Sequence, residues 1–217
     1  MKKRFAKILF WLVAITSVVI SGFVIAQCNR EAKLQAGIAD EIIRFHVRAN
    51  SDSDEDQKIK MEVKKNVVDY ICPILSNSNS VEESKNILLN HQDDIKEVAL
   101  NTLKSMNCDY DVSVYMEKSY FPMKSYGDIM LPPGDYEAFR IDIGEASGKN
   151  WWCVLFPPLC FVDVTYGVVP EDSKAQLKQV LTEDEYNVVT GSSNENITYK
   201  FKYFTFLNKL IEKSGKG

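Results

Sequence analysis

An uncharged apolar segment near the N-terminus constrains this chain more than any other sequence feature. Residues Ile8–Ala26 contain no charged side chain, and the basic residues Lys2, Lys3, Arg4 and Lys7 precede them. A basic flank followed by such a run is typical of an export signal or a membrane anchor. The run exceeds the ~7–15 apolar residues of a cleaved signal and approaches the ~18 that cross a bilayer. We therefore expect the basic end to stay inside the cell and the remainder to be exported.

Two fates of this leader stay open. Val24–Ala26 is a suitable cleavage site before Gln27, so residues 1–26 act as a cleaved signal peptide or as an uncleaved membrane anchor. Cys28 invites a lipoprotein interpretation, but lipid attachment requires a small residue before the cysteine, and Gln27 is not small. A buried core helix is a further alternative, although the segment has no polar face to present to water. Residues 27–40 follow as a juxtamembrane spacer.

The charge of the remaining chain bears on its partners. The whole chain has a formal net charge of −4 and the leader carries +4, so residues 27–217 carry −8. Nucleic-acid binding requires a basic face that neutralises phosphates, and no basic stripe with interleaved aromatic residues precedes the C-terminal tail. We therefore expect no nucleic-acid partner. With 45% hydrophobic and 26% charged residues the composition is globular, and residues 41–217 have the length of a single extracytoplasmic domain.

The hydrophobic periodicity of this domain predicts an α+β fold. Apolar and polar residues alternate in three segments, and a fourth is apolar on both faces, so all four are expected to be strands. These segments are Ile42–Ala49, Tyr110–Glu117, Ala138–Ile143 and Trp151–Phe156. Apolar residues recur at helical spacing over Asp54–Leu75 and from Ser80 to Met106. The order strand, helix, helix, strand, strand, strand predicts a two-layer sandwich, in which a mostly antiparallel four-stranded sheet packs on two helices.

Local signals refine this expectation. The second strand is expected to pair with the first, and the third and fourth strands to extend the sheet as a hairpin. Asp52 or Ser53 is expected to cap the first helix and Ser80 the second, because short polar side chains accept hydrogen bonds from free helical N–H groups. Pro73 is expected to kink or end the first helix. The segment 121–134, rich in proline and glycine, is expected to be a loop.

The C-terminal region is less regular. Additional helices are expected between Glu171 and Asn187, with a second cap near Thr182, and a loop over 191–196. Residues 197–213 fit either a short strand or a helix with a basic edge, which is docked on the domain or rests near anionic lipid.

The sequence offers little catalytic chemistry. His46 and His91 do not occur in a zinc-binding spacing such as H-E-x-x-H, and neither a G-x-S-x-G motif nor a phosphate-binding P-loop is present. The acidic run Asp52–Asp56 begins like a calcium loop, but Gln57 and Val63 stand where that loop requires a glycine and a bidentate glutamate. We therefore predict no catalytic residue, no cofactor, no metal site and no small-molecule ligand.

The cysteines allow a disulfide framework in an exported protein. Cys72, Cys108, Cys153 and Cys160 lie in the exported part, and four cysteines permit three pairings. Cys153 and Cys160 are close in sequence, and Pro157-Pro158 between them can turn the chain back. The alternative is that all four are small buried apolar residues.

Two clusters are candidates for contact with a partner. The acids of residues 52–56 either cap the following helix or form an acidic docking surface. Trp151 and Trp152 are neighbours on a strand, so one faces the core and the other the opposite side. An exposed tryptophan beside a rigid proline turn is a common contact anchor. The alternative is that both faces of this strand are covered, for instance by the C-terminal helices.

Three sequence blocks resemble the stage II sporulation protein R family. They are Ile43–Ser53 (IRFHVRANSDS) with Asp56-Gln57, Asp128–Ala138 (DIMLPPGDYEA) and Gly148–Cys160 (GKNWWCVLFPPLC). The resemblance extends from about Ala39 to Asp163, and its last block is highly specific. The leader and the variable C-terminal part, residues 163–217, match only loosely.

The resemblance implies a role in signalling. Members of this family are made in the forespore of endospore-forming bacteria and exported into the space between the forespore and mother-cell membranes. There they trigger a membrane-embedded aspartic protease of the mother cell, which processes the precursor of sigma factor E. The chain is then not an enzyme, and its partner is the extracytoplasmic or membrane part of that protease.

Contact with this partner is expected from the turn after the first strand and from the end of the fourth. The residues concerned are Arg48, Asn50, Ser51, Asp52, Asp56, Trp151, Trp152, Pro157 and Pro158. Two other functions stay open. One is a secreted hydrolase that uses a cysteine or a carboxylate, and the other is a structural protein of the envelope or septum.

Overall fold

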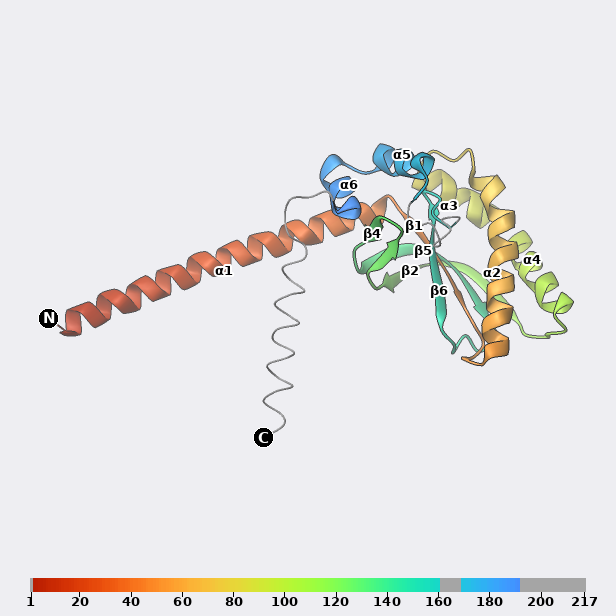
Figure 1. Cartoon of the computed structure of the whole chain (residues 1–217), viewed down its shortest axis with the longest axis horizontal. Helices are drawn as coiled ribbons and strands as arrows, with labels where there is room; N and C mark the ends of the chain where they lie inside the picture. The colour runs from red at the N-terminus through yellow and green to blue at the C-terminus, as the bar shows by residue number, and fades with distance from the viewer. Residues whose placement is uncertain (1, 161–168, 192–217) are drawn as a thin grey trace, which may run out of the picture.

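A long helix projects from a globular body in the computed structural model, which describes residues 2–160 and 169–191 (Figure 1). Leader and spacer form one continuous helix, α1 (Lys2–Asp40), and its side chains Phe10, Trp11 and Phe23 are 67%, 64% and 65% exposed. By length and composition α1 is able to cross a membrane, and none of its most apolar stretch is buried in the protein. The core-helix alternative is therefore wrong, because such a helix would be covered by other elements.

The body contains five further described helices, a four-stranded sheet and a separate hairpin. The helices are α2 (Asp54–Leu75), α3 (Val81–Asn90), α4 (Gln92–Ser105), α5 (Glu171–Val180) and α6 (Glu183–Thr190). The strands of the sheet are β1 (Ile43–Arg48), β2 (Val112–Phe121), β5 (Gly134–Ile143) and β6 (Asn150–Phe156). The hairpin consists of β3 (Lys124–Tyr126) and β4 (Ile129–Leu131). The predicted α+β class with additional C-terminal helices is confirmed.

The sheet is mixed, and its pairing corrects the sequence-based expectation. The strand order is β2-β5-β1-β6, with β1 and β5 parallel and the other neighbours antiparallel. The expected pairing of β1 with β2 is wrong, because β5 lies between them, and β5 and β6 do not form a hairpin, because β1 lies between them. Since β2 runs opposite to β1 and β5 runs opposite to β2, inserting β5 beside β1 makes that pair parallel. Strand β1 lies inside the sheet, between β5 and β6, and its residues are buried on both faces, as is usual for an inner strand.

One face of the sheet is covered by helices, which lie to its right in Figure 1. Phe45, Ile141 and Leu155 of this face belong to one continuous core with apolar residues of α2, α3 and α4. The helical members of that core recur at the spacing of one helix face, for example Ile59, Val63, Val67 and Ile71 of α2. The predicted packing of helices on one side of the sheet follows directly from this periodicity.

The helix starts agree with the predicted caps, and one helix differs from the prediction. The Ser53 hydroxyl accepts from the Asp56 amide at 3.1 Å, and Thr182 forms a full capping box with Glu185. Pro73 falls in the last turn of α2, which ends at Leu75, two residues further on, as predicted. The predicted second helix is divided at His91 into α3 and α4, because the chain turns there to keep Leu88 and Ile95 buried.

The opposite face of the sheet, termed the second face here, is covered over only one of its halves. There the β3–β4 hairpin, α5, α6 and the last turn of α1 enclose a second core. Ile38 and Ala39 of α1 are buried in it, and the carboxylate of Glu185 of α6 lies against Gly37. The predicted loop 121–134 is wrong in part, since it contains this hairpin. The segment 192–213 lies outside the described residues.

Candidate partner-binding surface

The predicted contact residues of the first turn are engaged in hydrogen bonds within the protein. Asp56 is buried and accepts from the Asn50 amide at 2.9 Å and from the Ser51 hydroxyl at 2.5 Å. Burial alone would raise the pKa of Asp56, but the hydrogen bonds from Ser51 and Asn50 lower it below its usual value. The carboxylate therefore stays charged and holds the start of α2 against the end of β1.

The same turn also holds the β5–β6 connection. Asn50 accepts from the backbone amide of Glu145 at 3.0 Å, and Asp52 accepts from that of Lys149 at 2.7 Å. The backbone carbonyl of Asn50 accepts from the Ser147 hydroxyl at 2.6 Å. Gly144, with φ +57, leaves space for the Asn50 side chain, which a Cβ there would meet. This internal network accounts for the Asn-Ser-Asp-Ser block without any partner.

The two tryptophans lie on opposite faces of β6, as the alternation predicts. Trp151 packs edge-on against Phe45 of the helix-covered core, with ring centroids 6.1 Å apart, and Lys64 lies 4.7 Å from its ring. Trp152 is half-buried on the second face, where Lys124 of β3 lies 3.8 Å from its ring. Neither ring is fully exposed, and each has a lysine ammonium against it. The attraction between a cation and the face of an aromatic ring stabilises both contacts.

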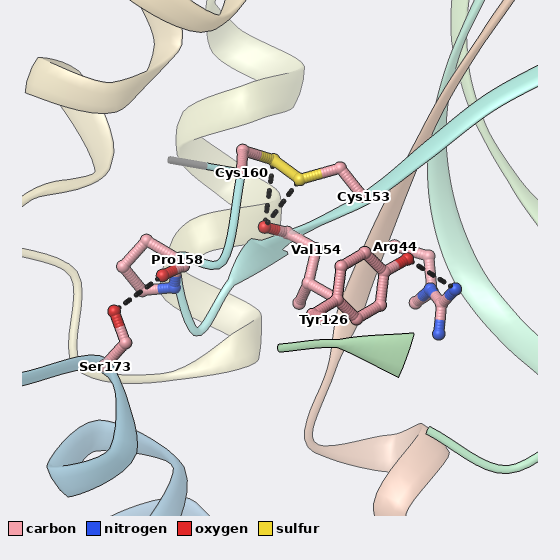
Figure 2. Close-up of a disulfide and its surroundings, with 7 residues drawn as sticks. All are labelled: Arg44, Tyr126, Cys153, Val154, Pro158, Cys160 and Ser173. Atoms are coloured by element: carbon pink, nitrogen blue, oxygen red, sulfur yellow. Dashed lines mark hydrogen bonds between the residues drawn. A yellow bond between two sulfur atoms is a disulfide. The ribbon is translucent and has the colours of Figure 1, made fainter. Parts of the chain in front are cut away.

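The end of β6 is closed by a disulfide between Cys153 and Cys160 (Figure 2). The Cys160 sulfur lies 3.0 Å from the Val154 carbonyl oxygen. That oxygen accepts a hydrogen bond from the Leu159 amide at 3.1 Å. Pro157 is buried in this turn, and the Pro158 carbonyl accepts from Ser173 of α5 at 2.9 Å. The proline turn therefore docks α5 onto the sheet, and Pro157 is not accessible to a partner in this conformation.

Of the remaining described cysteines, Cys28 lies on α1 outside the domain, and Cys72 is unsuited to nucleophilic chemistry at neutral pH. Burial raises the pKa of the Cys72 thiol to about 12, so it stays protonated, and Cys108 is partly buried. No group of three or more histidine, cysteine, aspartate or glutamate side chains that could hold a metal ion occurs among residues 2–160 and 169–191.

The row of basic side chains that alternate along β1 lies on the second face, as the alternation predicts, but Arg44 and His46 are buried there, which the sequence did not indicate. Arg44 is completely buried and donates to the Tyr126 hydroxyl at 3.0 Å (Figure 2). Its guanidinium also lies 4.4 Å from the Phe121 ring and 5.1 Å from the Tyr136 ring. Burial lowers the pKa of Arg44, and no described carboxylate pairs with it. Aromatic faces thus replace a counter-ion for this cation.

His46, the next member of the row, is neutral at physiological pH. Burial and then the neighbouring Arg140 cation lower its pKa to about 4. Its Nε2 atom lies 3.6 Å from Glu117, and neither ring nitrogen has a hydrogen-bond partner. His46 thus packs as a ring, 5.4 Å from that of Phe121.

The half of the second face away from the second core forms a mainly polar surface, termed here the open sheet face, and Trp152 lies at its border, where Lys124 of the hairpin contacts the ring. Six partly buried residues from the four strands belong to it: Tyr115, Arg140, Asp142, Arg48, Asn150 and Trp152. Arg140 donates to Glu117 and to Asp142, each at 2.8 Å, and Tyr115 donates to Asp142 at 2.8 Å. Of the predicted contact residues, the structure brings Arg48 and Trp152 together here. The alternating polar residues of β1 and β5 were the sequence signal for this surface.

Comparisons with known proteins agree with this architecture. The family model described as stage II sporulation protein R matches residues 39–166, which include β1 to β6. The chain is 38% identical over 161 residues to stage II sporulation protein R of Bacillus subtilis (strain 168), covering 73% of this chain and 71% of that protein. No solved structure matches. On the strength of the family match and this identity, the chain belongs to the stage II sporulation protein R family.

Proposed function

We propose that this chain is a signalling protein that leaves the forespore and activates a membrane-embedded aspartic protease of the mother cell, which then processes the sigma E precursor. Membership in the stage II sporulation protein R family carries this proposal, and a role in sporulation follows from that membership. The finer steps are those that the resemblance of the three sequence blocks implies. They require a protein that is exported and that acts by binding.

Export is supported by the N-terminal helix and by the disulfide. Helix α1 is able to enter a membrane, as a signal or as an anchor. The disulfide between Cys153 and Cys160 is typical of proteins that work outside the reducing cytoplasm. Because Ile38 and Ala39 at the end of α1 belong to the second core, the domain begins within this helix and lies close to the membrane if the leader stays attached. Attachment would raise the effective concentration of the domain at a membrane receptor.

Action by binding is supported by the state of the candidate reactive groups. Cys153 and Cys160 are linked to each other, the Cys72 thiol has a pKa of about 12, and His46 is neutral and lacks a hydrogen-bond partner. None of these offers the nucleophile and adjacent base that a hydrolase requires. A ligand needs no reactive group, because it activates its receptor by binding the active form more tightly than the idle form. A shift from 1% to 99% active requires a preference of about 10⁴-fold.

Reconstitution in a bacterium without other sporulation genes tests the proposal. The full chain, with its own leader, would be produced beside the protease and a tagged sigma E precursor. We expect cleavage of the precursor only when all three proteins are present. A chain that lacks residues 2–26 stays in the cytoplasm and serves as the control, with cleavage expected to fall to the level seen without the chain.

Two results would argue against the proposed function. Absence of cleavage, with the oxidised chain and the protease both detected in the membrane and envelope fractions, would contradict it. Cleavage of a peptide or glycan by the purified chain alone would favour the hydrolase instead.

A further inference from the structure

The open sheet face contains an arginine that the rest of the described protein leaves without a counter-ion. Both neighbouring carboxylates, Glu117 and Asp142, are within 2.8 Å of Arg140, whose cation they neutralise. Arg48 lies next to Asp142 in the β1–β5 register but forms no ion pair with any described residue. Its Nε atom is buried and has no hydrogen-bond partner. The two carboxylates balance Arg140 and Arg48 in formal charge, but both are held by Arg140, so Arg48 is the cation of this group without an ion pair.

A second unpartnered polar atom lies beside this arginine. Asn150 is directly opposite Arg48 in the antiparallel register of β1 and β6, and its Oδ1 atom is buried without a donor. Buried polar atoms in folded proteins are nearly always hydrogen-bonded, because leaving them unpaired is costly. One unpaired donor and one unpaired acceptor on adjacent strands indicate a site that an incoming group completes.

The chemistry of the two atoms specifies that group. Arg48 requires an acceptor, and a carboxylate satisfies it best because the hydrogen bond is then charge-assisted. Asn150 Oδ1 requires a donor, such as a backbone N–H. A polypeptide with an acidic side chain supplies both and can also pair with a strand edge, whereas a lipid headgroup supplies donors and acceptors but no strand. The observations therefore favour a protein segment over a membrane surface.

The position of β6 specifies the conformation of that segment. Strand β6 is an edge of the sheet, and the Val154 carbonyl on its outer side is already occupied by the Leu159 amide. Backbone groups alternate in direction along a strand, so Trp152 and Asn150 also present theirs to the outer side. No described backbone group pairs with them there. An exposed strand edge of this kind binds an extended peptide by adding it as a further strand.

We propose that the outer edge of β6, with Arg48 and Asn150, binds an extended acidic segment of the receptor by strand addition. The inference rests on the proposed function, because the receptor is taken to be the extracytoplasmic part of the protease. Trp152 borders the same site. Its half-buried ring offers an aromatic contact to the receptor segment, beside the acidic residue that Arg48 binds. Charge complementarity with Arg48 selects an acidic segment, and the acidic remainder of the domain repels it from other surfaces.

Charge reversal in the reconstituted system tests this proposal. Arg48→Glu in the full chain is expected to lower the rate of precursor cleavage by at least about tenfold, because it places like charges together. Lys118→Glu is the matched control, since Lys118 is exposed on β2, the opposite edge of the sheet, and it is expected to change the rate by less than about twofold. Changing acidic residues of the protease's extracytoplasmic part to lysine, one at a time, is expected to restore cleavage with Arg48→Glu at one or more positions.

Folding of each variant is measured independently, from the oxidised state of Cys153 and Cys160 and from the thermal unfolding of the purified chain. Where Arg48→Glu does not fold, the neutral variant Arg48→Gln replaces it, and it is also expected to lower the rate of precursor cleavage. Cleavage of the precursor at the original rate by a folded Arg48 variant would overturn the proposal. A fall in the cleavage rate with Lys118→Glu as large as that with Arg48→Glu would also overturn it.

Other occupants give distinct results. If no acidic-to-lysine change restores cleavage, and Arg48→Glu instead abolishes binding of the purified chain to phosphatidylglycerol vesicles, the site binds lipid and the proposal is wrong. If the unmodified chain produces no cleavage, the proposed function fails before this surface is tested.

Discussion

The helix-covered face and the second face of the sheet are built from the same four strands, yet they bury different side chains. The first contacts α2, α3 and α4 through aliphatic and aromatic residues such as Phe45, Ile141 and Leu155. The second carries Arg44, His46 and Arg140 at positions that alternate with these. An apolar face requires only burial, whereas a polar face requires a partner for each donor and acceptor. The first face is therefore mainly apolar, whereas the second combines an apolar core in one half with polar groups that lack partners in the described protein.

The same contrast between apolar burial and polar groups distinguishes the two halves of the second face. In one half, α5, α6, the hairpin and the end of α1 cover the sheet, and even the Arg44 cation is enclosed by aromatic rings. In the other half, Arg48, Asn150 and Asp142 are polar and partly buried. The family match extends over β1 to β6 and ends at residue 166, before α5 begins.

The largest expected effect tests the helix-covered face. Phe45→Ala removes a completely buried ring that contacts Phe139 and Trp151, so we expect the free energy of unfolding to fall by about 3–5 kcal/mol. Chemical denaturation of the purified chain measures this. Loss of less than about 1 kcal/mol would mean that this face contributes less to stability than its burial indicates.

The next prediction concerns pH and the second face. The pKa of His46 is about 4 in the folded protein, against 6.5 for an ordinary histidine, so below pH 6.5 the unfolded chain binds a proton that the folded chain does not. The resulting stability is present in full above pH 6.5 and is lost as the pH falls to about 4, by about 3 kcal/mol at ~1.4 kcal/mol per pKa unit. His46→Gln should show a shallower decline over this range. Identical pH profiles for the two proteins would refute the buried, neutral state of His46.

The disulfide at the end of β6 is expected to have a somewhat smaller effect. Cys153 and Cys160 are separated by 7 residues, and closing so short a loop restricts the unfolded chain by about 2–3 kcal/mol. The double variant Cys153→Ser, Cys160→Ser should be destabilised by this amount in denaturation experiments. Dithiothreitol should destabilise the original chain similarly and leave the double variant unchanged; a shift of the double variant would point to another redox-sensitive group.

The smallest effect is expected on the open sheet face. Tyr115→Phe removes the hydroxyl that donates to Asp142 at 2.8 Å, and because the site is partly exposed we expect a loss of about 1 kcal/mol. Tyr120→Phe is the control, since Tyr120 is 65% exposed and has no described hydrogen bond, and its change should stay within about 0.5 kcal/mol. If Tyr115→Phe costs as much as Phe45→Ala, the contrast between the two faces is wrong.

Local patterns in the sequence were sufficient for most of the secondary structure. The spacing of Ile59, Val63 and Val67 predicted α2 and its buried face, and Ser53 and Thr182 predicted two helix starts. The β3–β4 hairpin was missed because each strand has three residues and lies in a segment whose prolines and glycines are typical of a loop. The order of the strands was missed because alternation reports which residues share a face and contains no information about neighbours.

The predicted contact residues fall into two groups, one engaged in hydrogen bonds inside the protein and one at the open sheet face. Asp56 and Asn50 were predicted as contact residues because they lie in the turn after the first strand, but hydrogen bonds with Ser51 and Glu145 occupy them inside the protein. Arg48 and Trp152 lie at a surface that sequence reasoning did not define, since Asn150, Asp142 and Tyr115 come from three other segments of the chain.

By itself, the sequence indicated a signal or membrane segment and which residues face a core, because a basic flank, an apolar run and a repeating apolar spacing are local properties. Only the tertiary structure decided that β5 separates β1 from β2, that Cys153 pairs with Cys160, and that Arg48 meets Asn150. Each of these depends on which distant segments approach one another. That choice is made by the packing of the whole domain, which buries β1 on both faces and leaves β6 at the edge.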